Sequence, residues 1–366
     1  MGLIGEVRSQ AHAAWVSRSL WSLPTLARTI ELPVAWYLRR DGTAPAPLIA
    51  CHYVTWACPE ACSFCNVTQA VETWMQPLPE AEMARMVDAL APRVPIWAIG
   101  GGEPLAHPGI LDHYARIKSH GGRIYTATAA TVLGETKARR IAEIGVDVVH
   151  VSLLGDESTH DAAMGRPGAW QRTTAGLAHL LRHRDPKKTR VIVNCPVSFE
   201  NAHALREVAR TARELGVDAL RFTWVSFLTE TERAAETHAV TYHVVPDATL
   251  AEFDARPVLA EARQLEREHR GWVSFHPQLD EDARAGWFQP GGGVSRRCHA
   301  LWHTLFLRPD GSVVPCQHLF EEPVGTVAGE GSGERLDTIW NGESLRRTRL
   351  AQRASPFPVC RRCCKV

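Results

Sequence analysis

Cys58-Pro59-Glu60-Ala61-Cys62-Ser63-Phe64-Cys65 spaces three cysteines as C-x3-C-x2-C. Three thiolates this close can hold three corners of a [4Fe–4S] cube. No fourth cysteine follows nearby, so one iron would keep an open coordination position. An open coordination position favours a catalytic site over a structural one. Zinc proteins show the same difference, because structural zinc has four protein ligands and catalytic zinc keeps one position free. The alternative is a zinc site, which would have to recruit Cys51 or His52.

A second motif, Gly100-Gly101-Gly102-Glu103-Pro104, follows the next strand-like segment. Glycines at a strand end let the backbone approach a ligand closely, although a tight strand-to-helix connection would also use them. Together the two motifs resemble the signature of the radical SAM superfamily. The resemblance implies that the amino and carboxylate groups of S-adenosylmethionine (SAM) chelate the open iron. It also implies that an electron from the cluster cleaves SAM to a 5′-deoxyadenosyl radical.

The resemblance further implies which residues contact SAM. In the family, the Gly-Gly-Glu segment holds the SAM amino group, and polar side chains at later strand ends face the ribose or carboxylate. Carried onto this chain, the SAM-binding residues are Phe64, Gly101, Gly102, Glu103, Ser152 and Asn194. Ser152 could equally be a solvated serine at a strand end. The chain has Thr126-Ala127-Thr128 where relatives often have Thr-Asn-Gly, which puts the asparagine contact in doubt.

Strand-like and helix-like patterns alternate between residues 47 and 277, as parallel βαβ units require. Apolar residues in the helical runs repeat at i, i+3, i+4 and i+7. The strand candidates are residues 48–54, 95–99, 123–128, 147–153, 190–195 and 219–225. Six such units predict an α/β fold, a partial (β/α)6 TIM-like barrel. Reactive groups in such barrels sit at the carboxyl ends of the strands, where the cysteine motif falls.

Three domains are expected from these patterns. Residues 1–46 form an N-terminal helical extension, interrupted at Pro24 and Pro33, that packs on the main domain or docks on a membrane surface or partner. Residues 47–278 form the barrel, and residues 279–366 form a small iron–sulfur domain after the glycine run at 291–293. The extension is shorter than the leader-binding domain of many peptide-modifying relatives.

The C-terminal cysteines predict a second metal site. Cys298 is followed by Gly311 and Cys316 in a C-x12-G-x4-C arrangement, and a C-x2-C-C run ends the chain. This arrangement resembles a shortened SPASM, or twitch-like, domain. Asp310-Gly311 independently predicts a hairpin turn. One auxiliary [4Fe–4S] cluster is expected, and a zinc ribbon is the alternative that spacing alone leaves open. The candidate ligands are Cys298, Cys316, Cys360 and Cys363, with Cys364 as a possible substitute.

A fully ligated auxiliary cluster can take an electron from a substrate radical, which favours net oxidation. Epimerisation would instead need a hydrogen-atom donor, and Cys195 at the end of the fifth strand candidate is one possibility. Alternatively, Cys195 is a small apolar residue of the hydrophobic core.

Composition limits the other possibilities. A chain with 45% hydrophobic and 22% charged residues should be globular, and a net charge of +1 gives no basic stripe for nucleic acid. Clustered cysteines suit a reducing compartment, so we expect the cytoplasm, and no segment predicts a signal peptide or membrane span.

The sequence therefore predicts a radical SAM oxidoreductase acting on a small natural-product intermediate, such as a sugar, aminocyclitol or nucleoside-like compound. A flavodoxin- or ferredoxin-type protein would supply electrons. One alternative is a peptide-modifying maturase that forms a cross-link or epimerises a residue. Another is a non-catalytic iron–sulfur or zinc protein.

Overall fold

A ten-stranded sheet forms the centre of the computed structural model, which describes residues 20, 23–29, 31–66, 76–238, 243–293 and 298–364. The strand order is β12-β11-β10-β1-β2-β3-β4-β5-β6-β9. The strands are β1 (Ile49–Tyr53), β2 (Ile96–Gly100), β3 (Arg123–Thr128), β4 (Val148–Ser152), β5 (Arg190–Val197), β6 (Ala219–Trp224), β9 (Val273–His276), β10 (Thr304–Leu307), β11 (Ser312–Val314) and β12 (Gly325–Thr326). Strands β7 (Leu228–Thr229) and β8 (Val244–Val245) pair separately.

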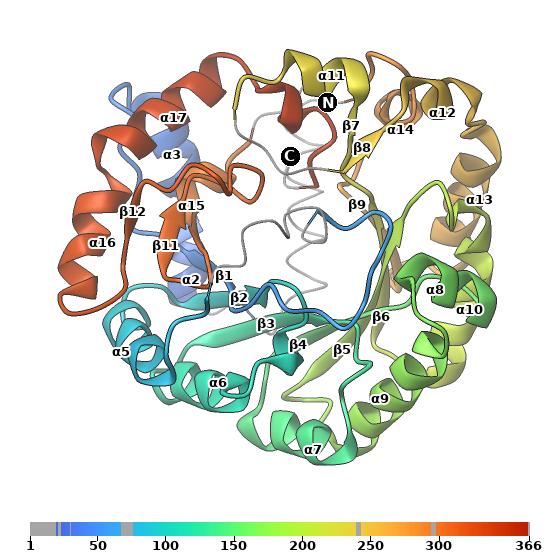
Figure 1. Cartoon of the computed structure of the whole chain (residues 1–366), viewed down its shortest axis with the longest axis horizontal. Coiled ribbons are helices and arrows are strands. Elements are labelled where there is room, and N and C mark those ends of the chain that lie inside the picture. The colour runs from blue at the N-terminus through green and yellow to red at the C-terminus, as the bar shows by residue number, and fades with distance from the viewer. Residues whose placement is uncertain are drawn as a thin grey trace.

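Helices surround the curved sheet as an outer ring (Figure 1). Those connecting the central strands are α5 (Glu80–Leu90), α6 (Ile110–Ser119), α7 (Glu135–Ile144), α8 (Glu157–Met164), α9 (Ala169–His183), α10 (Leu205–Leu215), α11 (Glu230–Ala235), α12 (Asp247–Glu252) and α13 (Arg256–Glu268). The others are α2 (Leu23–Thr29), α3 (Glu31–Leu38), α14 (Glu281–Trp287), α15 (Ala300–His303), α16 (Ser332–Trp340) and α17 (Glu343–Ala354).

All six predicted strands are confirmed within two residues at their starts and ends, and they pair in parallel in the order of the chain. Two further parallel strands extend the sheet, because β9 pairs with β6 and β10 pairs with β1. The α/β barrel class is therefore correct, with eight parallel strands instead of six.

The two faces of the sheet have different roles. The outer face carries valines of β4 and β5 that pack under the helices in the main hydrophobic core, which also holds Met83, Met86 and Leu90 of α5. The inner face carries a smaller apolar layer at Ile96, Val148, Ile192 and Ala219. Because successive strand residues point to opposite faces, neighbours in the chain serve different environments.

The N-terminal helices α2 and α3 pack on the rest of the protein. This agrees with the expectation that the extension packs on the main domain. Arg28 donates hydrogen bonds to the carbonyl oxygens of Ala46 (2.9 Å) and Pro47 (3.0 Å). Farther along, Ala44 donates to the Asn341 side chain (2.8 Å), which donates back to the Ala44 carbonyl (3.1 Å). Residues 1–19, which carry part of the predicted helical extension, lie outside the described residues.

The predicted hairpin at Asp310-Gly311 is confirmed, because β10 and β11 pair antiparallel across that turn. Gly311 adopts a φ of 76°, which favours glycine there. Since β10 also pairs with β1, the C-terminal segment is continuous with the barrel sheet. The division into three domains at residues 46 and 278 stays a prediction.

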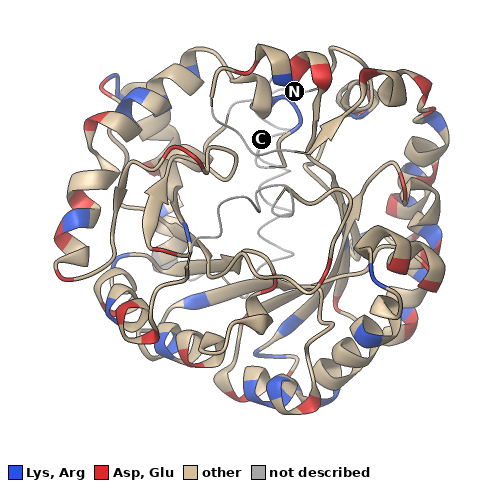
Figure 2. Ribbon diagram, in the orientation of Figure 1, with Lys and Arg blue, Asp and Glu red and all other residues tan. Residues whose placement is uncertain are grey.

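Lysine and arginine are interspersed with aspartate and glutamate around the outer helices (Figure 2). None of the helices in the described ranges has the length and apolar character needed to cross a bilayer.

Candidate functional site

The chain leaving β1 runs beside the glycine motif that follows β2. Gly102 donates to the Thr55 carbonyl (2.7 Å), and Glu103 donates to the Ala57 carbonyl (2.9 Å). These bonds continue the pairing of β1 with β2 up to the residue before Cys58. The structure therefore brings the two predicted motifs together at the carboxyl ends of adjacent strands.

The glycines are required by this close approach of two backbones. A Cβ atom on Gly101 would lie 2.3 Å from the Thr55 carbonyl oxygen, and one on Gly102 would lie 2.3 Å from the Ala57 carbonyl oxygen. Gly101 also has a φ of 126°, which side chains rarely tolerate. Close approach to a ligand and a tight strand-to-helix connection were the two expected uses of these glycines, whereas the neighbour here is the chain leading to Cys58. The SAM-binding role of both glycines stays a prediction.

Glu103 is buried and its carboxylate is held by three donors. It accepts hydrogen bonds from the Leu105 amide (2.9 Å), the Thr128 hydroxyl (2.8 Å) and the Ala129 amide (2.7 Å). Burial raises the pKa of Glu103 despite these bonds. Thr128 lies where relatives often have glycine, so the departure seen in the sequence places a hydroxyl on the Glu103 carboxylate.

The three cysteines of the first motif interact electrostatically. Burial and, to a smaller extent, the neighbouring thiolates of Cys65 and Cys58 together raise the pKa of Cys62 to about 12. Removal of protons from thiols this close is helped by a bound cation, because the metal ligand is the thiolate. This donor set fits the three-cysteine ligation of an iron–sulfur cluster.

Glu60, between the first two cysteines, is a buried carboxylate that the sequence argument did not single out. It is 7% exposed, and its Oε2 atom accepts no hydrogen bond within the described part of the chain. A buried acceptor without a donor is costly in a folded protein. Its place beside the cysteines fits a site that a cationic or hydrogen-bonding ligand would complete.

The loop after α8 supports the cysteine motif from the other side. Ala61 donates to the Met164 carbonyl (2.9 Å), and Arg166 donates to the Pro59 carbonyl (2.7 Å). Between them, Gly165 has a φ of 64° and allows the two chains to touch, because a Cβ atom there would lie 2.7 Å from the Ala61 carbonyl oxygen. These long-range contacts have no local signal in the sequence.

Two of the fainter predicted SAM contacts lie side by side on the sheet. Ser152 and Asn194 are register partners on β4 and β5, and both are partly exposed. The Thr223 hydroxyl donates to the Asn194 side-chain oxygen (2.8 Å). Phe64 packs partly against Leu154 and its apolar neighbours. The structure brings Ser152 and Asn194 together, and the SAM contacts of all three residues stay predictions.

Cys195 lies on the opposite face from Asn194. It is fully buried in the main hydrophobic core, and its sulfur accepts a 3.7 Å contact from the Asn201 amide. Burial raises the pKa of its thiol far above the usual value. This placement favours the core interpretation over the hydrogen-atom donor, which stays an untested prediction without structural support.

The predicted auxiliary ligands line one small apolar cavity. The cavity wall contains Cys298, Cys316, Cys360 and Cys363, together with Gln317 and His318. Burial, with a smaller contribution from the charge of Cys298, raises the pKa of Cys316 to about 12, although the His318 amide acts in the opposite direction. Four cysteines that line one cavity fit the ligand set of a fully ligated cluster. Cys364 contacts Gln317 at 3.5 Å and is not part of the cavity wall.

Within the described ranges, no three His, Cys, Asp or Glu side chains converge tightly enough to hold a single metal ion. His318 contacts the sulfur of Cys363 at 3.2 Å, and its backbone amide donates to the sulfur of Cys316 at 3.4 Å. Both contacts place hydrogen-bonding groups on predicted ligand sulfurs.

Aromatic side chains connect the two cysteine regions. Tyr53 at the end of β1 lies 5.0 Å from Phe320 and 5.5 Å from Trp56, measured between ring centroids. Trp56 lies just before Cys58, whereas Phe320 follows Cys316. These rings belong to the same cluster as Cys51, Cys298 and Cys316.

Comparisons with known proteins agree with this geometry. Residues 53–212 match the radical SAM superfamily, and residues 298–364 match SPASM, an iron–sulfur cluster-binding domain. The AdoMet-dependent heme synthase of Methanosarcina barkeri is 30% identical over 198 residues, which are 53% of this chain and 54% of that protein. The chain spans about half the length of the heme synthases it matches. The PqqA peptide cyclase of Methylocella silvestris is 25% identical over 78% of this chain and 72% of its own.

Solved structures share the fold. Streptococcus suis SuiB bound to S-adenosylmethionine has a TM-score of 0.62 at 16% identity, over 89% of this chain and 74% of that chain. The anSMEcpe structure with bound AdoMet and Cp18Cys peptide has a TM-score of 0.59 at 15% identity, over 84% of this chain and 83% of its own. The two cysteine sets thus lie in two stretches that match known domains, residues 53–212 a radical SAM domain and residues 298–364 a SPASM domain.

Proposed function

We propose that this chain is a radical SAM enzyme that removes a hydrogen atom from a small natural-product intermediate and oxidises it. The candidate substrates are sugars, aminocyclitols and nucleoside-like compounds. The two domains imply a SAM-binding [4Fe–4S] cluster and an auxiliary iron–sulfur cluster. Cys58, Cys62 and Cys65 would hold the first, and Cys298, Cys316, Cys360 and Cys363 the second.

The chemistry needs one electron at the start. When bound, the cluster and SAM would supply a 5′-deoxyadenosyl radical by one-electron cleavage that releases methionine, and this radical would take a hydrogen atom from the substrate to give 5′-deoxyadenosine. This chain's contribution would be to hold the reactants: the charges of Glu103 and Glu60 are close enough to act on the Cys58 thiol, and the Glu60 Oε2 atom accepts no hydrogen bond within the described residues. Gly101 and Gly102 keep the Glu103 segment against the cysteine loop.

The observation that carries the oxidation is the cavity shared by Cys298, Cys316, Cys360 and Cys363. A substrate carbon radical becomes a carbonyl or alkene by losing one proton and one electron. The proton leaves to a base or water, and the electron needs an acceptor close to the substrate. Tyr53, Trp56 and Phe320 place the cavity next to the barrel strand that leads to Cys58. An auxiliary cluster there would accept that electron.

A small-molecule substrate is supported by relatives named AdoMet-dependent heme synthase and Pre-heme d1 synthase. A peptide substrate is the second candidate, since a relative matched over 78% of this chain is named PqqA peptide cyclase and SuiB was solved with its precursor peptide. A third candidate is a metal protein that catalyses no reaction. Cleavage of SAM by the reconstituted protein would exclude it.

The test is SAM turnover by anaerobically reconstituted protein with dithionite as reductant. We expect 5′-deoxyadenosine to form, and its rate to rise when a panel of polyols, aminocyclitols and nucleosides contains the substrate. Stimulation by short peptides alone would favour the peptide candidate. No 5′-deoxyadenosine after full reconstitution would contradict the enzyme assignment. We further propose a reducing, cytoplasmic setting with a flavodoxin- or ferredoxin-type donor, testable by replacing dithionite with such a protein.

A further inference from the structure

The segment after β6 contacts both cysteine regions. It comprises residues 226–238 and 243–245, with α11 and the paired strands β7 and β8, and we call it the bracket. We propose that the bracket fixes the auxiliary cysteine loop and the first cysteine motif in one relative position. The inference rests on the proposed function, because it takes both cysteine sets as cluster ligands.

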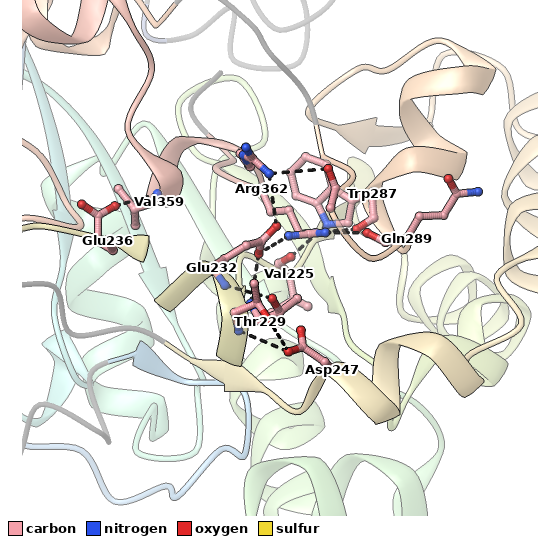
Figure 3. Close-up of polar contacts among 12 residues, drawn as sticks. Val225, Thr229, Glu232, Glu236, Asp247, Trp287, Gln289, Val359 and Arg362 are labelled. Atoms are coloured by element: carbon pink, nitrogen blue, oxygen red, sulfur yellow. Dashed lines mark hydrogen bonds and ion pairs between the residues drawn. The ribbon is translucent and has the colours of Figure 1, made fainter. Parts of the chain in front are cut away.

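Arg362 is the anchor at the auxiliary end of the bracket. It lies between Cys360 and Cys363 in the chain, is fully buried, and its guanidinium pairs with the Glu232 carboxylate of α11 (Figure 3). The same guanidinium donates to the carbonyl oxygens of Trp287 (2.7 Å) and Gln289 (2.7 Å). A buried ion pair holds its partners firmly when the remaining donors are also satisfied. The cysteine loop is therefore tied to the bracket at its centre.

Two more contacts hold the same loop. The Val359 amide donates to the Glu236 carboxylate (2.9 Å), as Figure 3 shows, and the Cys364 amide donates to the Ser226 hydroxyl (3.2 Å). The loop is thus held on both sides of Arg362. Each of these three contacts comes from the bracket and joins residues more than a hundred positions apart in the chain.

Glu232 is itself fixed within the bracket. It forms a capping box with Thr229, in which the Thr229 amide donates to the Glu232 carboxylate (3.0 Å) and the Glu232 amide donates to the Thr229 hydroxyl (3.2 Å). A capping box fixes the first turn of a helix. Thr229 and Glu232 of the bracket therefore orient the anchor.

The other end of the bracket reaches the first cysteine motif. Asn66, directly after Cys65, accepts a hydrogen bond from the His243 amide through its side-chain oxygen (2.8 Å). His243 is joined to Leu228 by a backbone bond (3.0 Å) at the start of the β7–β8 pairing. A continuous path of hydrogen bonds and short covalent steps therefore runs from Asn66 through His243, Leu228 and Glu232 to Arg362.

The consequence concerns the distance between the two proposed clusters. Electron exchange across a protein depends steeply on distance, and so does the magnetic coupling of two reduced clusters. A bracket bonded to both loops would keep that distance fixed while substrate enters and product leaves. Arg362 and Asn66 are then positioning residues that act through the cysteines beside them.

The experiment compares Arg362→Gln with Arg361→Gln in anaerobically reconstituted full-length protein. Arg361 is the matched control, because it lies in the same loop but its side chain is 50% exposed. Its Nη1 atom lies 3.9 Å from the Glu232 Oε1 atom, which is too far for a hydrogen bond. Iron and sulfide are counted, and EPR spectra of the reduced protein are recorded with and without SAM. We expect wild type and Arg361→Gln to hold about eight irons, and Arg362→Gln about four with its SAM-sensitive signal intact. Arg362→Lys should recover part of the lost iron, because it restores the charge but only one donor position.

Asn66→Ala tests the other end without touching a buried charge. We expect it to keep both clusters but to weaken or broaden the spin–spin interaction between them, which a general loss of stability would not do. If wild type shows two clusters and neither Arg362→Gln nor Asn66→Ala changes iron content or spin coupling, the bracket is overturned and the proposed function survives. If wild type holds only one cluster, both are overturned.

Discussion

The Thr128 hydroxyl donates a 2.8 Å hydrogen bond to the Glu103 carboxylate, which joins the end of β3 to the glycine motif after β2. Both residues are almost fully buried, at 3% and 1% exposure. Glu103 therefore reaches the first cysteine motif with its orientation fixed by the neighbouring strand.

Replacing Thr128 by Val removes this donor while keeping the shape of the side chain. A buried carboxylate that loses one of its donors is destabilised, so we expect about 1–2 kcal/mol less stability and weaker SAM binding. Urea unfolding and equilibrium dialysis with SAM measure the two effects. Thr338→Val, on an exposed helix face, is the matched control and should leave both unchanged.

Gly101→Ala should disrupt the approach of the glycine motif to the chain before Cys58. Its Cβ atom would lie 2.3 Å from the Thr55 carbonyl oxygen, so one backbone has to move. We expect a loss of at least ~2 kcal/mol and of the first cluster's iron. Gly134→Ala meets no atom within 4 Å and serves as control. Equal iron content and melting temperature in the two variants would refute this account of the motif.

His160 should make stability depend on pH. It is buried, its Nδ1 atom accepts from the Leu154 amide (3.1 Å), and burial lowers its pKa from 6.5 to about 4. Between pH 6.5 and about 4, His160 is therefore protonated in the unfolded chain but not in the folded chain. The stabilisation is complete above pH 6.5 and is lost as the pH falls toward 4, by about 1 kcal/mol at pH 5.5.

Thermal unfolding at pH 7.5 and 5.5 checks this for wild type and His160→Asn, whose side-chain oxygen can still accept from the Leu154 amide. The variant should lose less stability than wild type between the two pH values. Identical pH dependence in both proteins would show that His160 is not responsible.

Cys195→Ala should leave the chemistry intact. Because Cys195 lies on the helix-facing side of β5, the change removes one buried sulfur at a cost of about 1 kcal/mol. We expect unchanged 5′-deoxyadenosine formation and unchanged product formation once a substrate is found. If 5′-deoxyadenosine formed normally while product was lost, Cys195 would be the hydrogen-atom donor after all.

Much of the fold could be predicted because its signals are local. Buried parallel strands produce apolar runs, amphipathic helices produce a period of about 3.6 residues, and cysteine spacing carries the two cluster motifs. The Asp310-Gly311 hairpin could be predicted for the same reason.

The supporting contacts could not be predicted, because their partners are distant in the chain. Arg362 and Glu232 are 130 residues apart, and Arg166 reaches Pro59 across 107. The sequence also shows a glycine without showing what lies beside it, so the Ala57 backbone next to Gly102 could not be predicted. Strand alternation could have placed Cys195 on the face opposite Asn194, which is a signal that the sequence does contain.

The most direct test of the two-cluster account is the iron content of anaerobically reconstituted wild type beside a variant in which Cys58, Cys62 and Cys65 are all alanine. EPR spectra of the reduced proteins are recorded with and without SAM. The account predicts about eight irons in wild type, about four in the variant, and a SAM-altered signal in wild type alone. About four irons in wild type and none in the variant, with zinc bound, would make the C-terminal cysteines structural and contradict the proposed electron outlet.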